Sequence, residues 1–159
     1  MIFVGYSCIG KSLAAMMHDS VVDLDSSYFM IDGKKPDNWV ELYVSVADNL
    51  SKQGKTVLIS SHKEVREYMN KNKISFTAIF PSLGNKEVWL ERLRERYKLT
   101  NLEKDKRALE RAEQHYESDI ADLMNEKNKI VINGKNYLLE DFILGTKDRE
   151  AVDTFNMFF

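Results

Sequence analysis

The chain has 159 residues, and its 23 Lys and Arg side chains nearly balance 25 Asp and Glu side chains, giving a net charge of −2. A length near 150 residues is typical of one hydrophobic core, so we expect a single domain over 1–159. Hydrophobic residues make up 43% of the sequence and charged residues 30%, which excludes an extensively disordered or fibrous chain. The near-neutral charge also argues against broad binding of extended nucleic acid.

Neither a membrane-spanning stretch nor a secretory leader is visible in the sequence. No run approaches the roughly 18 consecutive apolar residues of a spanning helix. Residues 1–4 lead directly into Gly5 without a basic segment or a cleavable hydrophobic stretch. The single cysteine, Cys8, cannot form an internal disulfide. These features predict a cytoplasmic protein without a membrane partner.

Short apolar runs alternate with longer amphipathic runs along the chain, which is typical of a parallel sheet covered by helices. The apolar runs predict strands at residues 2–4, 21–24, 56–60, 76–80 and 129–132. The amphipathic runs predict helices at residues 11–18, 38–53, 63–72, 85–97, 104–125 and 138–144. We therefore expect an α/β protein with a five-stranded parallel sheet in a three-layer α/β/α arrangement.

Two segments do not fit this alternation. Residues 26–37 are polar and aromatic and contain Gly33 and Pro36, which predicts a long loop beside a strand end. Loops of this kind often carry function. The C-terminal segment, residues 145–159, is charged and then rich in phenylalanine. We expect it to dock on the core, and the alternatives are pairing with a second subunit or disorder, so that the protein is a monomer or a homodimer.

Residues 5–12 read Gly-Tyr-Ser-Cys-Ile-Gly-Lys-Ser and match G-x-x-x-x-G-K-[ST] at every fixed position, between a predicted strand and a predicted helix. The glycines let successive backbone N–H groups converge on one anion at the positive end of the helix dipole. Lys11 would bind the outer phosphates of ATP, and the Ser12 hydroxyl would bind Mg²⁺. The expected nucleotide-binding residues are Gly5, Ser7, Cys8, Ile9, Gly10, Lys11, Ser12 and Leu13.

Two carboxylates follow the second predicted strand. Alternation along a strand places Asp23 and Asp25 on the same side. Residues just after a strand face ligands that bind at the carboxyl edge of the sheet. One carboxylate could hold Mg²⁺ through water while the other orients or deprotonates the acceptor of a phosphoryl group. The alternative is a pair of solvated aspartates that cap the next loop through Ser26 and Ser27.

The segment after the third predicted strand has both a structural and a functional interpretation. Ser61 and Glu64 have the spacing of a capping box, which predicts a helix start. Ser60 could instead hold a metal-bound water, and Arg66 could reach an anionic acceptor. We expect His62 to be a surface or capping residue rather than a general base.

Four arginines in the fourth and fifth predicted helices are candidate phosphate ligands: Arg92, Arg96, Arg107 and Arg111. Arginine suits phosphate because its planar guanidinium donates two parallel hydrogen bonds and carries a compensating charge. Residues 98–105 predict a polar loop between the two helices. We expect one or two of the arginines to close over the nucleotide as a lid at about 97–107, and the others to form surface pairs with glutamates.

Together these features resemble the small P-loop kinases, a family that includes nucleoside monophosphate kinases, shikimate kinase and gluconate kinase. The resemblance covers residues 1–132 and rests on the phosphate loop, the Asp-x-Asp, the Ser-Ser-His-Lys-x-x-x-Arg and the Arg-x-x-x-Arg segments. It implies a P-loop NTPase fold with a helical lid and Mg²⁺-dependent transfer from ATP. It also implies that Asp23 lies near Mg²⁺, that Asp25 meets the acceptor, and that Arg92 and Arg96 are lid arginines that act in catalysis together with Lys11.

The acceptor is less clearly indicated. Adenylate-type kinases carry an Asp-Gly segment where this chain has residues 60–62, Ser-Ser-His, which are closer to the gluconate-type arrangement. The chain also looks like bacterial and phage P-loop kinases, which implies a deoxynucleotide acceptor. Tyr28, Phe29, Trp39 and Tyr43 offer aromatic faces to a nucleobase, and a helix core explains Trp39 and Tyr43 equally well because they are four residues apart. We expect a nucleoside monophosphate. The alternatives are a small hydroxylated metabolite, a polynucleotide 5′-end, or a nucleotide-binding regulator with slow ATPase activity.

Overall fold

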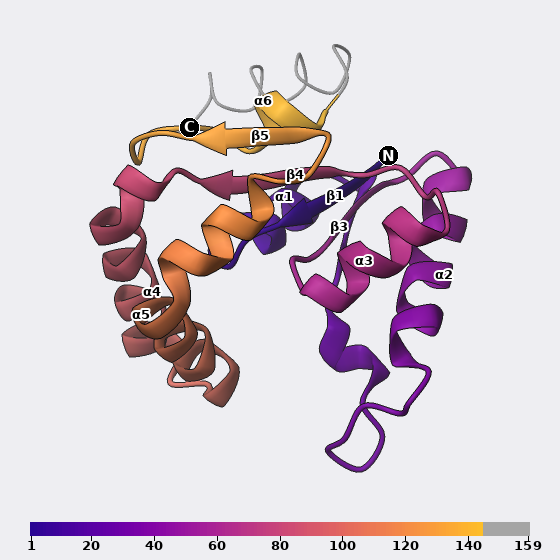
Figure 1. Cartoon of the computed structure of the whole chain (residues 1–159), viewed down its shortest axis with the longest axis horizontal. Coiled ribbons are helices and arrows are strands. Elements are labelled where there is room, and N and C mark those ends of the chain that lie inside the picture. Colours follow the sequence, from indigo (N-terminus) through magenta and orange to yellow (C-terminus); the bar gives the residue numbers. More distant parts are fainter. Residues whose placement is uncertain (145–159) are drawn as a thin grey trace.

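The structure is a computed structural model that describes residues 1–144, so the prediction for residues 145–159 lies outside the described residues. Its strands form a five-stranded, all-parallel sheet in the order β2-β3-β1-β4-β5 (Figure 1). The strands are β1 (Ile2–Gly5), β2 (Val21–Leu24), β3 (Thr56–Ser60), β4 (Thr77–Pro81) and β5 (Lys129–Ile132). The predicted α/β class and parallel sheet are confirmed.

Helices separate the successive strands. They are α1 (Lys11–Met17), η1 (Ser26–Phe29), α2 (Trp39–Lys52), α3 (Lys63–Lys71), η2 (Leu83–Asn85), α4 (Lys86–Thr100), α5 (Glu103–Leu123) and α6 (Glu140–Ile143). Among the helices of residues 1–144, none combines the length and the apolar character that a bilayer crossing requires.

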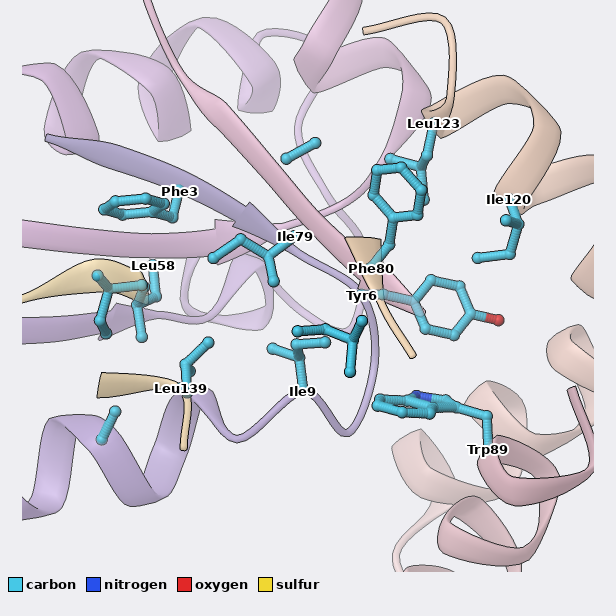
Figure 2. Packing of buried hydrophobic residues seen from close by; sticks show 14 of the residues in the cluster. Phe3, Tyr6, Ile9, Leu58, Ile79, Phe80, Trp89, Ile120, Leu123 and Leu139 are labelled. Carbon is cyan, nitrogen blue, oxygen red and sulfur yellow. The ribbon is translucent and has the colours of Figure 1, made fainter. Parts of the chain in front are cut away.

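Alternate residues of the central strand β1 belong to two hydrophobic clusters. Ile2 and Val4 pack with α2 and α3, for example against Met69. Phe3 belongs to the other cluster, which contains Trp89 and other buried residues of α4 and α5 (Figure 2). Successive side chains of a strand point to opposite faces of the sheet. Both faces of β1 are therefore buried, which explains why this central strand is apolar along its whole length.

The carboxyl ends of the parallel strands meet at one edge of the sheet. β1 pairs with β3 on one side and with β4 on the other, so that Gly5 lies opposite both Ser60 and Ile79. The chain leaves β1 toward β2 on one side and later continues to β4 and β5 on the other. Ligands of open parallel sheets bind where the strand order changes direction in this way.

The predicted connection between the two arginine-bearing helices is wrong in its extent. Residues 98–105 are almost entirely helical, because α4 continues to Thr100 and α5 begins at Glu103. Asn101 ends α4 with a positive φ of 54°, and its N–H donates to the Tyr97 carbonyl. Asparagine tolerates this left-handed conformation better than most residues. The two helices form an antiparallel hairpin, here named the α4–α5 hairpin. In the view of Figure 1 this hairpin and the loop after β2 both extend below the sheet.

The predicted long loop over residues 26–37 contains more order than expected. It begins with the short helix η1, whose first turn is capped by Asp25. Ile31 and Lys34 then form an isolated antiparallel bridge. The segment is therefore a folded excursion that leads from the end of β2 to the start of α2.

Candidate functional site

The phosphate loop, residues 5–12, connects β1 to α1 by a sharp turn. Cys8 and Gly10 adopt positive φ values of 65° and 109°. A Cβ atom on Gly5 would lie 2.9 Å from Cγ2 of Ile9, so no larger residue fits without displacing the loop. The two glycines of the motif thus meet steric demands of the loop itself.

Two side chains of this loop anchor it in the hydrophobic core. Tyr6 and Ile9 are buried beside Trp89 (Figure 2). Tyr6 also meets the ring of Tyr116 edge to face, with a centroid separation of 6.0 Å. This anchoring fixes the path of the backbone between β1 and α1.

Five consecutive carbonyl groups of the phosphate loop, residues 5–9, accept hydrogen bonds from side chains. Lys11 Nζ donates to the first two, at 2.8 Å to Gly5 and 3.3 Å to Tyr6. The other donors are Trp89 Nε1 to Ser7 at 2.8 Å, Arg92 Nη1 to Cys8 at 3.4 Å and the Tyr137 hydroxyl to Ile9 at 2.8 Å. The carbonyl side of the loop is therefore occupied by the protein.

The amide side of the same loop is mostly free. In a trans peptide, a carbonyl and the N–H of the following residue point in opposite directions. Because the carbonyls of residues 5–9 point toward their side-chain donors, the N–H groups that follow them point away from those donors. Tyr6 and Ile9 donate their N–H groups to other carbonyls. Within residues 1–144, no hydrogen bond engages the N–H groups of Ser7, Cys8, Gly10, Lys11 and Ser12. Such a series of unpaired amides can bind an anion.

Lys11 completes the loop with a partly buried cation. Burial lowers the pKa of its ammonium group to about 8, and the charge of Arg96 acts in the same direction while that of Asp23 opposes it. Among the described residues, the hydrogen-bond acceptors of Nζ are the carbonyls of Gly5 and Tyr6. A phosphate group would offer a charged acceptor and raise the pKa again.

Ser12 and Asp23 lie together beside the loop. The Ser12 Oγ donates to Asp23 Oδ2 at 3.0 Å, which joins the first turn of α1 to β2. Hydroxyl and carboxylate oxygens suit Mg²⁺, which keeps several waters and binds substrate phosphates. In the part of the chain that the structure describes, no group of three or more His, Cys, Asp or Glu side chains could hold a metal by itself. A Mg²⁺ ion here would therefore need further ligands, such as waters or the oxygens of a bound anion.

Asp25 caps the next segment and also faces the α4–α5 hairpin. Its carboxylate accepts the Ser27 N–H at 2.8 Å, as the capping alternative predicted. It also lies 3.6 Å from Nζ of Lys104 in the first turn of α5. Burial raises the pKa of Asp25, but the Ser27 hydrogen bonds and the Lys104 charge outweigh burial and hold it below its ordinary value. Asp25 is thus ionised at neutral pH, and it lies between the segment after β2 and the α4–α5 hairpin.

Arg96 extends from the α4–α5 hairpin to the phosphate loop. Its Nη1 lies 3.5 Å from Sγ of Cys8, and its Nε lies 3.3 Å from Oδ1 of the buried Asp105. Burial lowers the pKa of Arg96, but the contact with Cys8 and the charges of Asp105 and Asp23 raise it overall. A fixed positive charge therefore lies next to the free amides.

Arg92 contacts the phosphate loop from its carbonyl side. Besides the Cys8 carbonyl, it bonds to the Tyr137 hydroxyl and the Lys135 carbonyl, both at 2.9 Å. Its guanidinium carbon lies 4.6 Å from the centroid of the Trp89 ring. These contacts shape the loop, while the predicted direct contact of Arg92 with the nucleotide stays a prediction.

Three other predicted arginines are placed differently. Arg66 is buried, and its guanidinium bonds to Glu126 at 2.9 Å, Asp122 at 2.7 Å and the Ser61 carbonyl at 3.1 Å. This arrangement ties α3 to α5 and leaves little of the guanidinium for an acceptor. The exposed Arg111 forms a bidentate pair with Asp119 farther along α5, and the exposed Arg107 acts electrostatically on Lys35.

The predicted aromatic and apolar contacts also differ in accessibility. Tyr28 is 72% exposed, so its ring is available beside Asp25. Phe29 is partly buried against Tyr43, with ring centroids 5.3 Å apart. The side chain of Leu13 is exposed on α1, so the predicted contact of Leu13 with a nucleotide would involve its backbone.

The predicted capping box at Ser61 is wrong, because α3 begins after His62 and shows no side-chain cap. His62 occupies the N-cap position of α3 and is partly buried rather than on the surface. Its Nε2 lies 3.3 Å from Oγ of the buried Ser26, and its ring meets Trp39 edge to face. Burial, followed by the charge of Lys35, lowers the pKa of His62, so it is neutral at pH 7.

Trp39 was a candidate for stacking on a nucleobase, but the cation beside it, Lys35, was not predicted from the sequence. Lys35 Nζ lies 3.9 Å from the centroid of the Trp39 ring and 3.4 Å from Ser26 Oγ. Lys104 and Tyr137 were missed as well, and no motif marks any of them. The aromatic enrichment of residues 26–43 was the one signal that could have indicated the contact between Lys35 and Trp39.

A scan against protein-family models matches no family, and a search of the curated proteins gives no match. The site therefore has to be interpreted from its own geometry. That geometry combines free amides, a partly buried lysine, a Ser–Asp pair and an arginine at one edge of a parallel sheet.

Proposed function

We propose that the protein is an ATP- and Mg²⁺-dependent phosphotransferase that moves the γ-phosphoryl group to a small acceptor, a nucleoside monophosphate. The observation that carries this proposal is the polarity of the phosphate loop. Five successive carbonyls are held by side chains, while the amides of residues 7, 8 and 10–12 have no partner within the described chain. Such a loop suits the oxygens of a polyphosphate.

The fold that belongs to this proposal is a three-layer P-loop NTPase domain of the nucleotide-kinase type. The two hydrophobic clusters on alternate residues of β1 support the layered arrangement. The α4–α5 hairpin would serve as the lid, and a cytoplasmic location would supply ATP and Mg²⁺. The whole chain, residues 1–159, would form one domain.

The donor side of the reaction uses residues of three elements. The free amides and Lys11 would bind the β- and γ-phosphates, and Ser12 with Asp23 would hold Mg²⁺. When bound, Mg²⁺ offsets the negative charge of the phosphate oxygens. Arg96 would offset the charge that develops on the transferred group, and because it is already held in place it needs no reorganisation.

The acceptor side is centred on Asp25. An acceptor oxygen would form a bond to the γ-phosphorus while the bond between that phosphorus and the bridging oxygen breaks, and ADP leaves. Asp25 would orient the acceptor, and it would take up the proton if the acceptor is a hydroxyl group. Its lowered pKa keeps it ionised for this role. Closure of the hairpin would exclude water and so favour transfer over hydrolysis.

The charges and rings near Asp25 support a nucleotide as the acceptor. Lys35 and Lys104 supply positive charge, and Arg107 acts on Lys35 from the hairpin. Trp39 lies under Lys35, and Tyr28 is exposed nearby in sequence. Cations suit the phosphate of a monophosphate, and aromatic rings suit its base.

An acceptor screen tests this function. Purified protein, ATP and Mg²⁺ would be incubated with each ribo- and deoxynucleoside monophosphate, with hydroxylated metabolites and with a 5′-hydroxyl oligonucleotide, and ADP release would be measured. We expect release with one or more monophosphates, loss of it in Lys11→Ala and retention in the matched control Lys98→Ala on α4. Release with a metabolite or the oligonucleotide alone would replace the proposed acceptor. The absence of any acceptor-dependent ADP release would contradict the proposal.

A further inference from the structure

Asp105 is a buried carboxylate in the first turn of α5. Its side chain is only 7% exposed. Acidic residues are rarely buried without a partner, so the contacts of this carboxylate matter. Oδ2 accepts a hydrogen bond from the Thr100 hydroxyl at the end of α4, and Oδ1 pairs with Nε of Arg96. Both carboxylate oxygens are thus engaged, one by the hairpin turn and one by the arginine.

This contact determines which part of Arg96 remains available. The guanidinium is held by its Nε side, so the Nη nitrogens lie at its far end, and Nη1 is 3.5 Å from Sγ of Cys8 in the phosphate loop. Arg96 also lies within electrostatic reach of Lys11 and Asp23. Asp105, Cys8, Asp23 and Lys11 are the charged or titratable groups that act on Arg96 in this position.

The other arginines of the hairpin lack this combination. Arg111 pairs with Asp119 on α5. This pair acts electrostatically on Tyr6, but within residues 1–144 it forms no hydrogen bond with the phosphate loop. Arg92 reaches the loop, but its partners are carbonyl and hydroxyl groups. Among the four arginines, only Arg96 is both anchored by a buried carboxylate and placed on the phosphate loop.

We propose that Asp105 is a positioning residue that orients Arg96 so that its Nη groups meet the phosphoryl group that is transferred. This inference rests on the proposed function. Both oxygens of Asp105 are engaged by Thr100 and Arg96, and within residues 1–144 Asp105 forms no hydrogen bond or ion pair with the phosphate loop. Its effect is therefore transmitted through the guanidinium, which a rigid partner holds in place before the reaction.

Nucleotide binding tests this inference without knowledge of the acceptor. Dissociation constants for adenylyl imidodiphosphate, an unreactive triphosphate, and for ADP would be measured with Mg²⁺ in the wild type, Arg96→Ala and Asp105→Ala. We expect both variants to lose about tenfold in triphosphate affinity, the size of one charged hydrogen bond, with ADP affinity nearly unchanged. The matched control Asp119→Ala, which breaks another Arg–Asp pair of α5, should bind like the wild type.

A second variant and a double variant separate positioning from folding. Asp105→Asn keeps the size of the side chain and an acceptor for Thr100, and we expect the same selective loss at an unchanged unfolding temperature. Arg96→Ala with Asp105→Ala should be no weaker than Arg96→Ala alone, because one residue acts through the other. Additive losses, or equal losses for ADP and the triphosphate, would overturn the inference.

The outcomes also distinguish this inference from the function on which it rests. If the wild type binds neither nucleotide, the proposed function fails and the inference fails with it. If the wild type binds both and Arg96→Ala weakens only the triphosphate, but Asp105→Ala and Asp105→Asn bind normally, the inference alone is wrong.

Discussion

Tyr137 shows how distant residues shape the phosphate loop. Its hydroxyl donates to the Ile9 carbonyl across 128 positions of sequence and accepts a bond from Arg92. The sequence motif specifies the glycines, the lysine and the serine of the loop. The side chains that hold the last three of its carbonyls come from α4 and the segment after β5, and no local pattern identifies Trp89 or Tyr137.

Removing the Tyr137 hydroxyl should weaken phosphate binding. Tyr137→Phe leaves the Ile9 carbonyl without its donor, at a cost of about 1–3 kcal/mol if it stays buried, so the loop holds its amides less firmly. We expect the dissociation constant of adenylyl imidodiphosphate to rise about three- to tenfold by calorimetry. Tyr68→Phe, on α3 in the other hydrophobic cluster, is the control. Equal affinities of the two variants would show that the Tyr137 contact is dispensable.

The lowered pKa of Lys11 predicts that nucleotide binding is coupled to proton uptake. With a pKa of about 8 in the free protein, Lys11 is partly neutral above pH 8, and bound phosphates raise that pKa. Binding should therefore take up protons above pH 8 and weaken as the pH rises further. Calorimetry at pH 8.5 in two buffers of different ionisation enthalpy measures this uptake. It should vanish in Lys11→Met, and uptake that persists in this variant would assign the proton to another group.

At the scale of elements, Arg66 joins two helices that are distant in sequence. Its partners Asp122 and Glu126 lie 56 and 60 residues later, at the end of α5 and just beyond it. The sequence suggested an anion-binding role because an arginine after a strand near the nucleotide is positioned for one. The packing of these two carboxylates against Arg66 could not be predicted from the sequence.

Breaking this ion pair should destabilise the fold. Arg66→Ala leaves Glu126, whose side chain is 11% exposed, without its cation, and we expect the free energy of unfolding to fall by about 3 kcal/mol. Urea denaturation measures the change. The control Lys52→Ala removes an exposed pair with Asp48 within α2 and should cost less than about 0.5 kcal/mol. A similar small loss for Arg66→Ala would contradict a structural role.

The hairpin turn offers a test of local backbone conformation. Asn101 has a φ of 54°, a conformation that glycine adopts freely and alanine does not. Asn101→Ala should therefore lower the stability by about 1 kcal/mol, a fall of a few degrees in the unfolding temperature, whereas Asn101→Gly should be close to neutral. Calorimetric melting of both variants decides the matter, and identical melting temperatures would contradict the assigned conformation.

The strands and helices were predictable because their periodicity is strong. All five strands agree with the predicted ranges to within one residue at each end, since each apolar run is bounded by turn residues. Helix ends were harder. The α4–α5 connection looked like a loop because residues 98–105 are polar, but Thr100 and Asp105 bond across a turn of only two residues. Contacts of this kind depend on tertiary geometry.

At the scale of the whole molecule, the site joins segments that meet only in the folded chain. The phosphate loop follows β1, Asp23 and Asp25 belong to the end of β2, and Arg96 comes from the hairpin. The motif and the parallel sheet were sufficient to predict that the first two would lie together. The Lys104–Asp25 contact, which brings the hairpin to the acceptor side, was beyond prediction because exposed lysines carry no positional signal.

If the protein is a phosphotransferase, the γ-phosphoryl group of ATP reaches an acceptor rather than water. The most direct measurement uses ATP labelled with ¹⁸O on its γ-phosphate, a mixture of nucleoside monophosphates and mass spectrometry of the products. We predict a labelled nucleoside diphosphate with the wild type and with Lys98→Ala, and a loss of more than about a hundredfold in Lys11→Ala and Asp25→Asn. Label found only in inorganic phosphate would contradict the account and identify a slow ATPase instead.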